Sequence, residues 1–379
     1  MPSRVFIATV IAILGLLHFY IGWHILPDLP LPYFFKVVGT TWLVLSFFLV
    51  PAGLLSRLIE KQPLADRLAW AGMLAMGFFS SLLLLTFVRQ IFLLVVVLTD
   101  VVAPKAAGDS ALLVPLLALA VTVLGYFNAR RVASVRRIDV PIAGLPHGLE
   151  GFTIAQISDI HIGPTIKGDY LDAIVDKVNR LEVDLIAVTG DLVDGSVEQL
   201  RDHTAPLAKL SARHGAFFVT GNHEYYSNAP AWIAEVRRLG LTVLMNEHVL
   251  LRHSEATLLV AGVTDFTAHH FDEAQRSDPH AAIKGAPRNI GMKLLLAHQP
   301  RSAVAAADAG FDLQLSGHTH GGQFFPWNLF VPLQQPFTAG LNRLQQLWVY
   351  TSRGTGYWGP PKRLLAPSEI THLTLVAAL

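Results

Sequence analysis

The sequence predicts a chain of two parts, an all-α transmembrane block of about four helices followed by an α/β domain. The 379 residues are 52% hydrophobic and only 15% charged, with a mean hydropathy of +0.44, which excludes a disordered chain and an ordinary soluble protein. Residues 1–127 hold seven Lys or Arg and five Asp or Glu, so most of the charge lies in the rest of the chain. There, short β-rich runs alternate with amphipathic helices, as in α/β domains.

Four segments of the first part are long and apolar enough to cross a bilayer as helices, for which about 20 residues are needed. They are residues 5–26, 33–55, 68–98 and 111–127. A cleaved signal peptide is the alternative for the first segment, but no small-residue cleavage pattern follows it, so we expect a retained anchor. The third segment is overlong and contains Arg89, and we expect it to tilt or to extend beyond the membrane.

The charges that flank these segments predict the side of the membrane on which the second part lies. With four spans, the start of the chain, the loop between spans two and three and the whole second part share one side. That side carries eight basic residues near the spans, against Lys36 and Lys105 on the other; the eight are Arg4, Arg57, Lys61, Arg67, Arg130, Arg131, Arg136 and Arg137. The positive-inside rule places that side in the cytoplasm, and an odd number of spans would reverse the prediction.

Composition excludes several classes of function. The chain has no Cys, which excludes disulfides, thiolate metal sites, iron–sulfur clusters and cysteine nucleophiles. Its net charge of +1 gives no electrostatic basis for binding nucleic acid, so we expect no nucleic-acid partner. His18, His24 and Arg89 lie in the apolar block, where ionisable residues are functional candidates. We prefer the alternative that Arg89 reaches the interface and the histidines lie near span ends or pack between helices.

In the second part, polar residues directly follow the predicted strands. Residues 152–158 form a predicted strand that leads into Asp159 and His161, and residues 170–181 have helical spacing. Four later predicted strands, 184–189, 215–220, 292–297 and 311–316, are followed in turn by Asp191, Asn222, His298 and the pair His318 and His320. Because open α/β sheets bind ligands beyond the carboxyl ends of their strands, we expect these loops to converge.

The residues at these strand ends offer only oxygen and imidazole donors. They are Asp159, His161, Asp191, Asn222, His298, His318 and His320. This mixture suits Mn, Fe or Zn, whereas an all-oxygen set would favour Mg or Ca. Seven ligands are too many for one tetrahedral ion, but a shared carboxylate lets them hold two divalent metal ions about 3.5–4 Å apart. The sequence therefore predicts a dinuclear metal centre, with Gly190, Gly221 and Gly317 allowing the backbone to approach the ions.

Each motif has a structural alternative when it is taken alone. Asp-x-His is common in surface loops, Gly-Asp after a strand is usually a turn, Asn-His can cap a helix, and His-x-His is a modest metal indication. In this order, however, DIH, GDLVD, GNHE, AH and GHTHGG resemble the motifs of the calcineurin-like metallophosphoesterases. The GHTHGGQ form and the closing WGPPKRLLAPSEITHLTL are similar to bacterial membrane-associated phosphoesterases. The resemblance covers residues 151–379 only.

The resemblance implies a two-sheet sandwich flanked by helices and a ligand assignment. Together with the apolar block, it leads us to expect a bacterial inner-membrane protein. The expected domains are a transmembrane helical domain at 1–128, a basic linker at 129–150 and a catalytic domain at 151–379. Carried over by motif, the first ion takes Asp159, His161, Asp191 and His320. The second ion takes Asp191, Asn222, His298 and His318, so that Asp191 bridges the two.

His223 follows a ligand and is itself spare. The resemblance implies that it assists the reaction at phosphate, and we predict that it acts as a general acid. The alternative is a structural role in which it hydrogen-bonds Asp159. Asp194 and Glu224 are interpreted as supporting residues or helix caps. The pair His269 and His270 is interpreted as part of a solvated loop, and Arg353 as a minor candidate for phosphate contact.

These observations predict a membrane-anchored, metal-dependent phosphoric ester hydrolase acting on a phosphomonoester or a phosphodiester. Residues 323–333, QFFPWNLFVPL, are apolar, and Pro326 and Pro332 favour a loop over a core strand. Aromatic residues favour the membrane interface, so we expect a lipid-linked phosphoester, the alternative being a soluble substrate and a loop that packs inside. Two rival functions stay open: a catalytically silent scaffold of this fold, and a regulator attached to a transporter-like membrane block.

Overall fold

The computed structural model describes residues 4–59, 61–99, 104–287 and 289–378. The chain divides into two compact units, each with its own packing. The first comprises Met1–Phe127 together with Gly359–Lys362, and the second comprises Asn128–Trp358 together with Arg363–Leu379. Each unit is described separately below.

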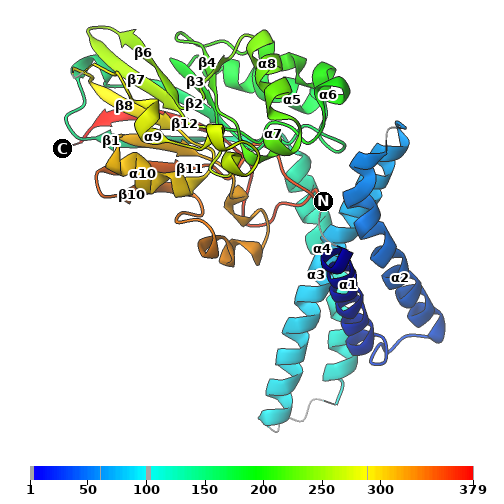
Figure 1. The fold of residues 1–379 in the computed structure, drawn as a ribbon. Helices are drawn as coiled ribbons and strands as arrows, with labels where there is room; N and C mark the ends of the chain where they lie inside the picture. Colours follow the sequence, from blue (N-terminus) through cyan, green and yellow to red (C-terminus); the bar gives the residue numbers. More distant parts are fainter. Residues whose placement is uncertain (1–3, 60, 100–103, 288, 379) are drawn as a thin grey trace. The chain divides into compact units, whose positions relative to one another are not determined.

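The first unit consists of helices. They are α1 (Arg4–Ile25), α2 (Tyr33–Leu55), the short η1 (Ser56–Leu58), α3 (Leu64–Leu98) and α4 (Ala106–Arg130) (Figure 1). The four long helices are each long and apolar enough to cross a membrane. The four predicted helices are therefore confirmed, with α3 and α4 beginning four and five residues earlier than the apolar segments at 68 and 111.

Small residues bring two of these helices into close contact. A Cβ atom added at Gly72 on α3 would lie 2.5 Å from Gly53 Cα on α2, and 2.4 Å from the Leu49 carbonyl oxygen. Only glycine permits such an approach, which is how helices associate in a membrane without a hydrophobic driving force. His18 packs between helices as expected: its Nε2 lies 2.9 Å from Ser46 Oγ, and its ring stacks on Phe79.

Arg89, which we expect to reach the membrane interface, is buried and paired with a residue of the connection after α1. Its side chain is 2% exposed and pairs with Asp28, with an Nη2 to Oδ2 distance of 2.5 Å. The guanidinium also donates to Ser110 Oγ and to the carbonyl oxygens of His24 and Ala107. These partners satisfy the buried cation and tie α3 to the ends of α1 and α4.

The second unit is a sandwich of two six-stranded sheets, which confirms the predicted fold. The first sheet has the order β1-β12-β2-β3-β4-β5, and the second has the order β10-β11-β9-β8-β7-β6. The strands of the first sheet are β1 (Ser134–Ile142), β2 (Thr153–Ile157), β3 (Leu185–Val188), β4 (Ala216–Phe218), β5 (Thr242–Val243) and β12 (Glu369–Ala377). Those of the second are β6 (Glu247–His253), β7 (Ala256–Gly262), β8 (Met292–Leu296), β9 (Leu313–Ser316), β10 (Gly340–Leu344) and β11 (Leu347–Thr351).

Both faces of each sheet are buried, so alternate residues along a strand enter different cores. Leu185 and Leu294 meet between the sheets. Ile186 points the other way, toward Trp232 and the helices on the outer face of the first sheet, and Leu295 packs toward those of the second. The helices are α5 (Gly168–Asn179), α6 (Val197–Thr204), α7 (Asn222–Tyr226), α8 (Ala229–Arg238), α9 (Pro279–Ala282) and α10 (Ala303–Asp308). Figure 1 shows α5, α6 and α8 on one side of the sandwich and α9 and α10 on the other.

The expected basic linker at residues 129–150 is wrong over much of its length. Ser134–Ile142 forms β1, which pairs in parallel with β12 from Ser134 opposite Glu369 to Ile142 opposite Ala377. Val140 and Ile142 are buried in the core between the sheets, whereas the basic residues lie in the half-exposed first part of the strand. Arg136 and Arg137 suggested a solvated linker, but one edge of a sheet also accommodates charged side chains.

Candidate metal centre

The candidate residues lie where strands of the two sheets end. Strands β2, β3 and β4 run parallel in the first sheet, and β8 and β9 run parallel in the second. In the first sheet, Asp159 and His161 follow β2, Asp191 follows β3 and Asn222 begins α7 after β4. In the second sheet, His298 follows β8, and His318 and His320 follow β9. The two sheets therefore present all seven predicted residues from the carboxyl ends of five strands, which is the arrangement that the sequence predicts.

Five of the seven residues have backbone φ angles in the left-handed region. They are Asp159, His161, Asp191, His318 and His320, with φ between 50° and 69°. Such angles are uncommon for residues with a Cβ and are retained where the surrounding structure fixes them, often at functional sites. Here they turn each loop sharply enough to direct consecutive polar side chains back over the strand ends.

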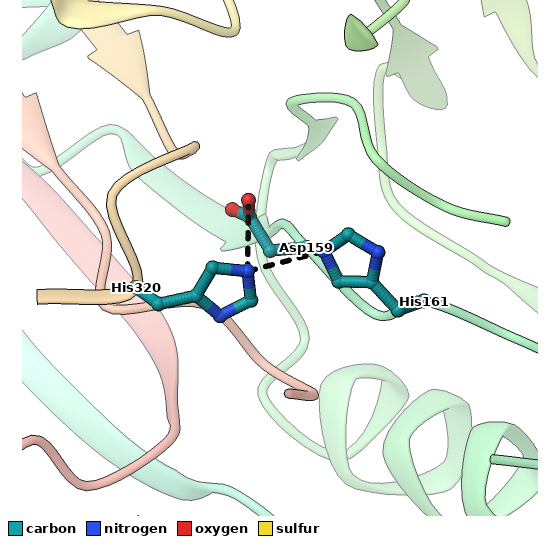
Figure 2. Close-up of side chains that lie close together, drawn as sticks. All are labelled: Asp159, His161 and His320. Carbon is teal, nitrogen blue, oxygen red and sulfur yellow. Dashed lines mark hydrogen bonds and ion pairs between the residues drawn. The ribbon is translucent and has the colours of Figure 1, made fainter. Parts of the chain in front are cut away.

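One cluster contains Asp159, His161 and His320 (Figure 2). The two imidazoles point their Nε2 atoms at each other at 3.1 Å, and His320 Nε2 lies 3.6 Å from Asp159 Oδ1. Two ligands of one tetrahedral ion, each about 2.0–2.1 Å from it, lie about 3.3 Å apart. The spacing of these donor atoms therefore fits a shared cation.

The second cluster contains Asp191, His298 and His318. His298 Nε2 lies 3.1 Å from Asp191 Oδ2 and 3.3 Å from His318 Nδ1. Asn222 joins this cluster, because its Oδ1 lies 3.0 Å from His318 Nδ1. Asp191 Oδ2 is also 3.9 Å from His161 Nε2, so this one carboxylate lies between the two clusters.

Further contacts fix the rings of the imidazoles. His298 Nδ1 donates a hydrogen bond to the Thr189 carbonyl oxygen at 2.7 Å, and His161 Nδ1 lies 3.2 Å from Asp194 Oδ1. Both rings therefore direct Nε2 toward the cluster. Partners of this kind set the tautomer and orientation of metal-binding histidines.

The pKa values show how the buried charges compensate one another. Burial raises the pKa of Asp159 and would raise that of Asp191, but His298 and His223 hold the pKa of Asp191 well below its usual range. Burial lowers the pKa of His318 to about 3, with the positive charge of His298 acting in the same direction. Burial and the neighbouring His161 keep the pKa of His320 well below its usual range. His318 and His320 are therefore neutral, the form in which imidazole binds metals.

The donor set fits divalent cations. Asp159, Asp191 and Glu224 are buried carboxyl groups within one small region. Glu224 is satisfied by the backbone, because it accepts hydrogen bonds from the N–H groups of Gly221, Asp191 and Leu192. Asp159 also accepts from the His318 N–H, and Asp191 from the His223 N–H, and both carboxylates face Nε2 atoms of the clusters as well. Buried carboxylates need positive charge nearby. Although burial alone lowers the pKa of His298, Asp191 and Asp159 raise it well above its usual range, so this imidazole supplies part of that charge. The mixed oxygen and imidazole donors also suit divalent cations.

His223 lies beside both clusters. Its Nδ1 is 2.5 Å from Asp194 Oδ1, its Nε2 is 4.0 Å from Asp191 Oδ2, and its ring centroid is 4.6 Å from that of His161. The structure thus pairs His223 with Asp194 and not with Asp159. Burial by itself lowers the pKa of His223, but Asp191 and Asp194 outweigh this effect and raise it to about 9. The imidazole is therefore protonated at neutral pH.

Other residues that the sequence left ambiguous now have partners. Asp194 supports His161 and His223 and does not cap a helix; Ser196 is the N-cap of α6. Arg353 Nη1 lies 3.0 Å from Glu369 Oε2, so this guanidinium is already paired. His269 and His270 lie in the short η4 (Ala268–His270), away from either cluster, and His270 is exposed.

Sequence reasoning missed two residues that contact the site. Trp358 lies beside His223, with 5.6 Å between ring centroids. The buried Arg363 donates from Nη2 to His320 Nδ1 at 3.0 Å and from Nε to the Gly356 carbonyl oxygen at 2.9 Å. Both lie in the closing segment WGPPKRLLAPSEITHLTL, which was the one signal for them in the sequence.

Comparisons with known proteins agree with this geometry. The family described as calcineurin-like phosphoesterase matches residues 152–322. Over 381 residues the chain is 31% identical to an uncharacterized metallophosphoesterase of Campylobacter jejuni, with 98% of each chain covered. It is 36% identical over 288 residues to a transmembrane protein with metallophosphoesterase domain from Danio rerio, covering 73% of this chain and 66% of that one. The chain thus spans just under two thirds of the length of the latter relative.

The chain belongs to the calcineurin-like phosphoesterase family. Among solved structures it is similar to a 5′-nucleotidase precursor from Thermus thermophilus, with a TM-score of 0.39 and 14% identity over 60% of this chain and 54% of that one. The family match spans the motifs that follow β2, β3, β4, β8 and β9.

The close packing of Gly317 gives a first prediction. A Cβ atom at this position would lie 2.0 Å from Ser158 Oγ and 2.1 Å from Asp159 Oδ2, so the carboxylate would have to move. We expect Gly317→Ala to reduce Mn²⁺ affinity at least about tenfold, as even changes around a ligand do. Metal titration with circular dichroism would measure this. Gly240→Ala is the control, since a Cβ atom at Gly240 would meet nothing within 4 Å; equal Mn²⁺ affinity in both variants would contradict the prediction.

Proposed function

We propose that this protein is a membrane-anchored phosphoesterase that uses two divalent metal ions to hydrolyse a phosphomonoester or a phosphodiester. The observation that carries the proposal is the position of Asp191 between two clusters of metal-type donors. Its Oδ2 lies 3.1 Å from His298 Nε2 in one cluster and 3.9 Å from His161 Nε2 in the other. A carboxylate in that position can serve both ions of a dinuclear site.

The proposed ligands follow from the two clusters. One ion would be held by Asp159, His161, Asp191 and His320, and the other by Asp191, Asn222, His298 and His318. Their nitrogen and oxygen donors favour Mn, Fe or Zn. When bound, such ions would activate water at neutral pH and neutralise charge on the phosphoryl group.

His223 is proposed as the general acid that protonates the leaving oxygen. Asp194 occupies Nδ1, so that Nε2 is the nitrogen directed toward the clusters, where a leaving oxygen could take its proton. Asp194 is the positioning residue in this pair, because it also lies 3.2 Å from His161 Nδ1 and so fixes both rings together. General acid–base help of this kind contributes about 10²–10⁴-fold in rate.

The proposed location is a bacterial inner membrane, with the second unit in the cytoplasm. Four helices of sufficient length and apolarity support the membrane anchor, and the even number keeps the start of the chain and the second unit on one side. The eight-to-two distribution of basic residues supports the cytoplasm for that side. A lipid-linked phosphoester is the proposed substrate class, supported by the exposed apolar side chains that follow His320.

The shared carboxylate gives a prediction that tests the dinuclear proposal directly. We expect Asp191→Ala to abolish phosphoester hydrolysis and to lower bound metal, because one side chain serves both clusters. Metal analysis and turnover of generic mono- and diesters with Mn, Fe, Zn and Mg would measure both effects. Asp172→Ala, a change in a half-exposed surface ion pair with Lys209, is the control. Full activity in Asp191→Ala would rule out the dinuclear proposal, and a wild-type protein that binds metal without turnover would indicate a silent scaffold.

Replacing the proposed general acid should separate rate from metal binding. We expect His223→Gln to keep its metal and to lose about 10²–10⁴-fold in kcat, since the leaving oxygen loses its proton donor. The deficit should be smallest for substrates whose leaving group is already a weak base, such as 4-nitrophenyl esters. The exposed His280→Ala serves as the matched histidine control. Loss of metal in step with kcat would instead assign His223 to the ligands.

The distribution of basic residues predicts the side of the second unit. Green fluorescent protein should be fluorescent and alkaline phosphatase inactive when each is fused to the carboxyl terminus. The opposite result is expected when each is inserted between Pro27 and Pro32, in the loop after α1. Paired alkaline phosphatase and green fluorescent protein fusions would measure this. The reverse pattern would show that the second unit lies outside the cytoplasm.

A further inference from the structure

An uncharged apolar surface begins directly after the last candidate ligand. From Gly321 to Asn342 the chain contains no Lys, Arg, Asp, Glu or His. Before β10 this segment contains no strand in the part of the chain that the structure describes. It contains the short helices η8 (Trp327–Leu329) and η9 (Val331–Leu333). Several of its large side chains point outward. Together with two residues of the closing segment they form what we call the apolar rim: Phe325, Trp327, Leu329, Phe330, Trp358 and Leu365, each between 42% and 83% exposed.

Internal contacts hold the apolar rim in one place. Gln323 donates from Nε2 to the Trp358 carbonyl oxygen and accepts from the Trp358 N–H, both at 2.9 Å. Phe324 is buried beneath the rim, bridges to Leu365 and packs edge-on against Trp327. The two segments of the rim are therefore joined by backbone and side-chain contacts. Exposed aromatic side chains on an ordered loop are typical of binding surfaces.

The apolar rim meets the candidate metal centre at His223. The Trp358 ring lies 5.6 Å from the His223 ring at 71°, and the exposed Tyr226 ring lies 5.3 Å from it at 69°. His161 approaches His223 from the cluster at 4.6 Å. His223 thus has the metal-type donors on one side and aromatic groups on others. The group next to the proton donor in hydrolysis is the leaving group, so the apolar contacts lie on the leaving-group side.

We propose that the apolar rim binds the alkyl chain of a lipid phosphoester, and that this chain belongs to the alcohol that leaves. The inference rests on the proposed function. In the step, the oxygen of water bonds to phosphorus, the bond between phosphorus and the lipid oxygen breaks, and His223 gives its proton to that oxygen. One proton of water remains on the new phosphate hydroxyl and the other returns to His223. The products are a lipid alcohol and a water-soluble phosphate.

The four membrane-spanning helices in the same chain make a lipid the occupant to which the rim is assigned. A chain anchored in a bilayer meets its lipids at high local concentration, and Trp and Phe side chains are favoured at the level of the headgroups. A water-soluble leaving group would leave these six side chains in water without a function.

Matched soluble probes test the proposal without micelles. Full-length protein in nanodiscs is loaded with Mn²⁺ and assayed with octyl and butyl phosphate. If it hydrolyses only diesters, octyl methyl phosphate and butyl methyl phosphate are used instead. Empty nanodiscs measure how much of each ester partitions into lipid, and the free ester concentration is corrected for this. We expect a KM about tenfold lower for the octyl ester, because its four extra methylenes bury apolar surface. In the double variant Trp327→Ser/Phe330→Ser, this preference should disappear, with the KM for the octyl ester rising about tenfold toward that for the butyl ester. Val304→Ser, which removes an exposed apolar residue on α10, is the control and should keep the preference.

Two further readouts address the side of cleavage and binding without turnover. Octyl methyl phosphate should yield octanol and methyl phosphate; methanol and octyl phosphate would overturn the assignment of the leaving group. Metal-free protein should bind octylphosphonate more tightly than butylphosphonate, and the double variant should bind both equally. Hydrolysis of butyl esters with no octyl preference would overturn this inference and leave the proposed function intact. Equal losses on both esters in the double variant would make the rim structural and overturn it, whereas no hydrolysis of any ester would contradict the proposed function itself.

Discussion

Buried negative charge at the ends of the strands is the constraint on which the second unit depends. Asp159 and Glu224 have no exposed surface, and Asp191 has almost none. Burying a carboxylate without compensation costs free energy, so each one needs hydrogen-bond donors or positive charge nearby. Glu224 accepts hydrogen bonds from three backbone N–H groups, and Asp194 pairs with two imidazoles. Asp159 and Asp191 each accept from one backbone N–H group and also face imidazole nitrogens, at 3.6 Å from His320 Nε2 and 3.1 Å from His298 Nε2 respectively.

The sandwich supplies this geometry because its two sheets contribute different donors. The first sheet brings the carboxylates after β2 and β3, and the second brings three imidazoles after β8 and β9. His298 spans the two, since its Nδ1 contacts the Thr189 carbonyl oxygen of the first sheet while its Nε2 faces Asp191. The donor residues of the two sheets can approach one another only if the loops turn tightly. At Gly317, any side chain would collide with Asp159. The backbone strain at the neighbouring ligands is thus compensated by the packing of both sheets.

Much of the second unit could be predicted because its signals are local. Strands such as β3 and β8 are short apolar runs, and the polar residues after them follow in a recognisable order. Features that depend on distant pairing were missed. β1 carries Arg136, Arg137 and Asp139 and pairs with β12 more than 230 residues later, so its sequence alone resembles a linker. The supporting roles of Asp194 and Glu224 also depend on which loop lies opposite, and motif spacing does not contain that information.

In the first unit, too, contacts between residues distant in the sequence could not be predicted. Length and apolarity were sufficient to predict four helices, because a bilayer imposes both. The partner of Arg89 was not predictable from periodicity, since Asp28 lies in the connection after α1, sixty-one residues away. A cation on an isolated helix is expected to extend to the interface. Once the connection after α1 brings a carboxylate within reach, and α1 and α4 bring carbonyl oxygens, a buried pair becomes favourable for the same residue.

The position of His223 links the chemistry of the site to its selectivity. The ring is fixed from behind by Asp194, approached by His161 on the side of the clusters and flanked by Trp358 and Tyr226 on the others. In the proposed function, a leaving group that takes a proton from His223 would lie beside these two aromatic rings. Its placement matters because the donor and the leaving oxygen must come within hydrogen-bond distance. Selection of the substrate and delivery of the proton would then depend on the same few contacts.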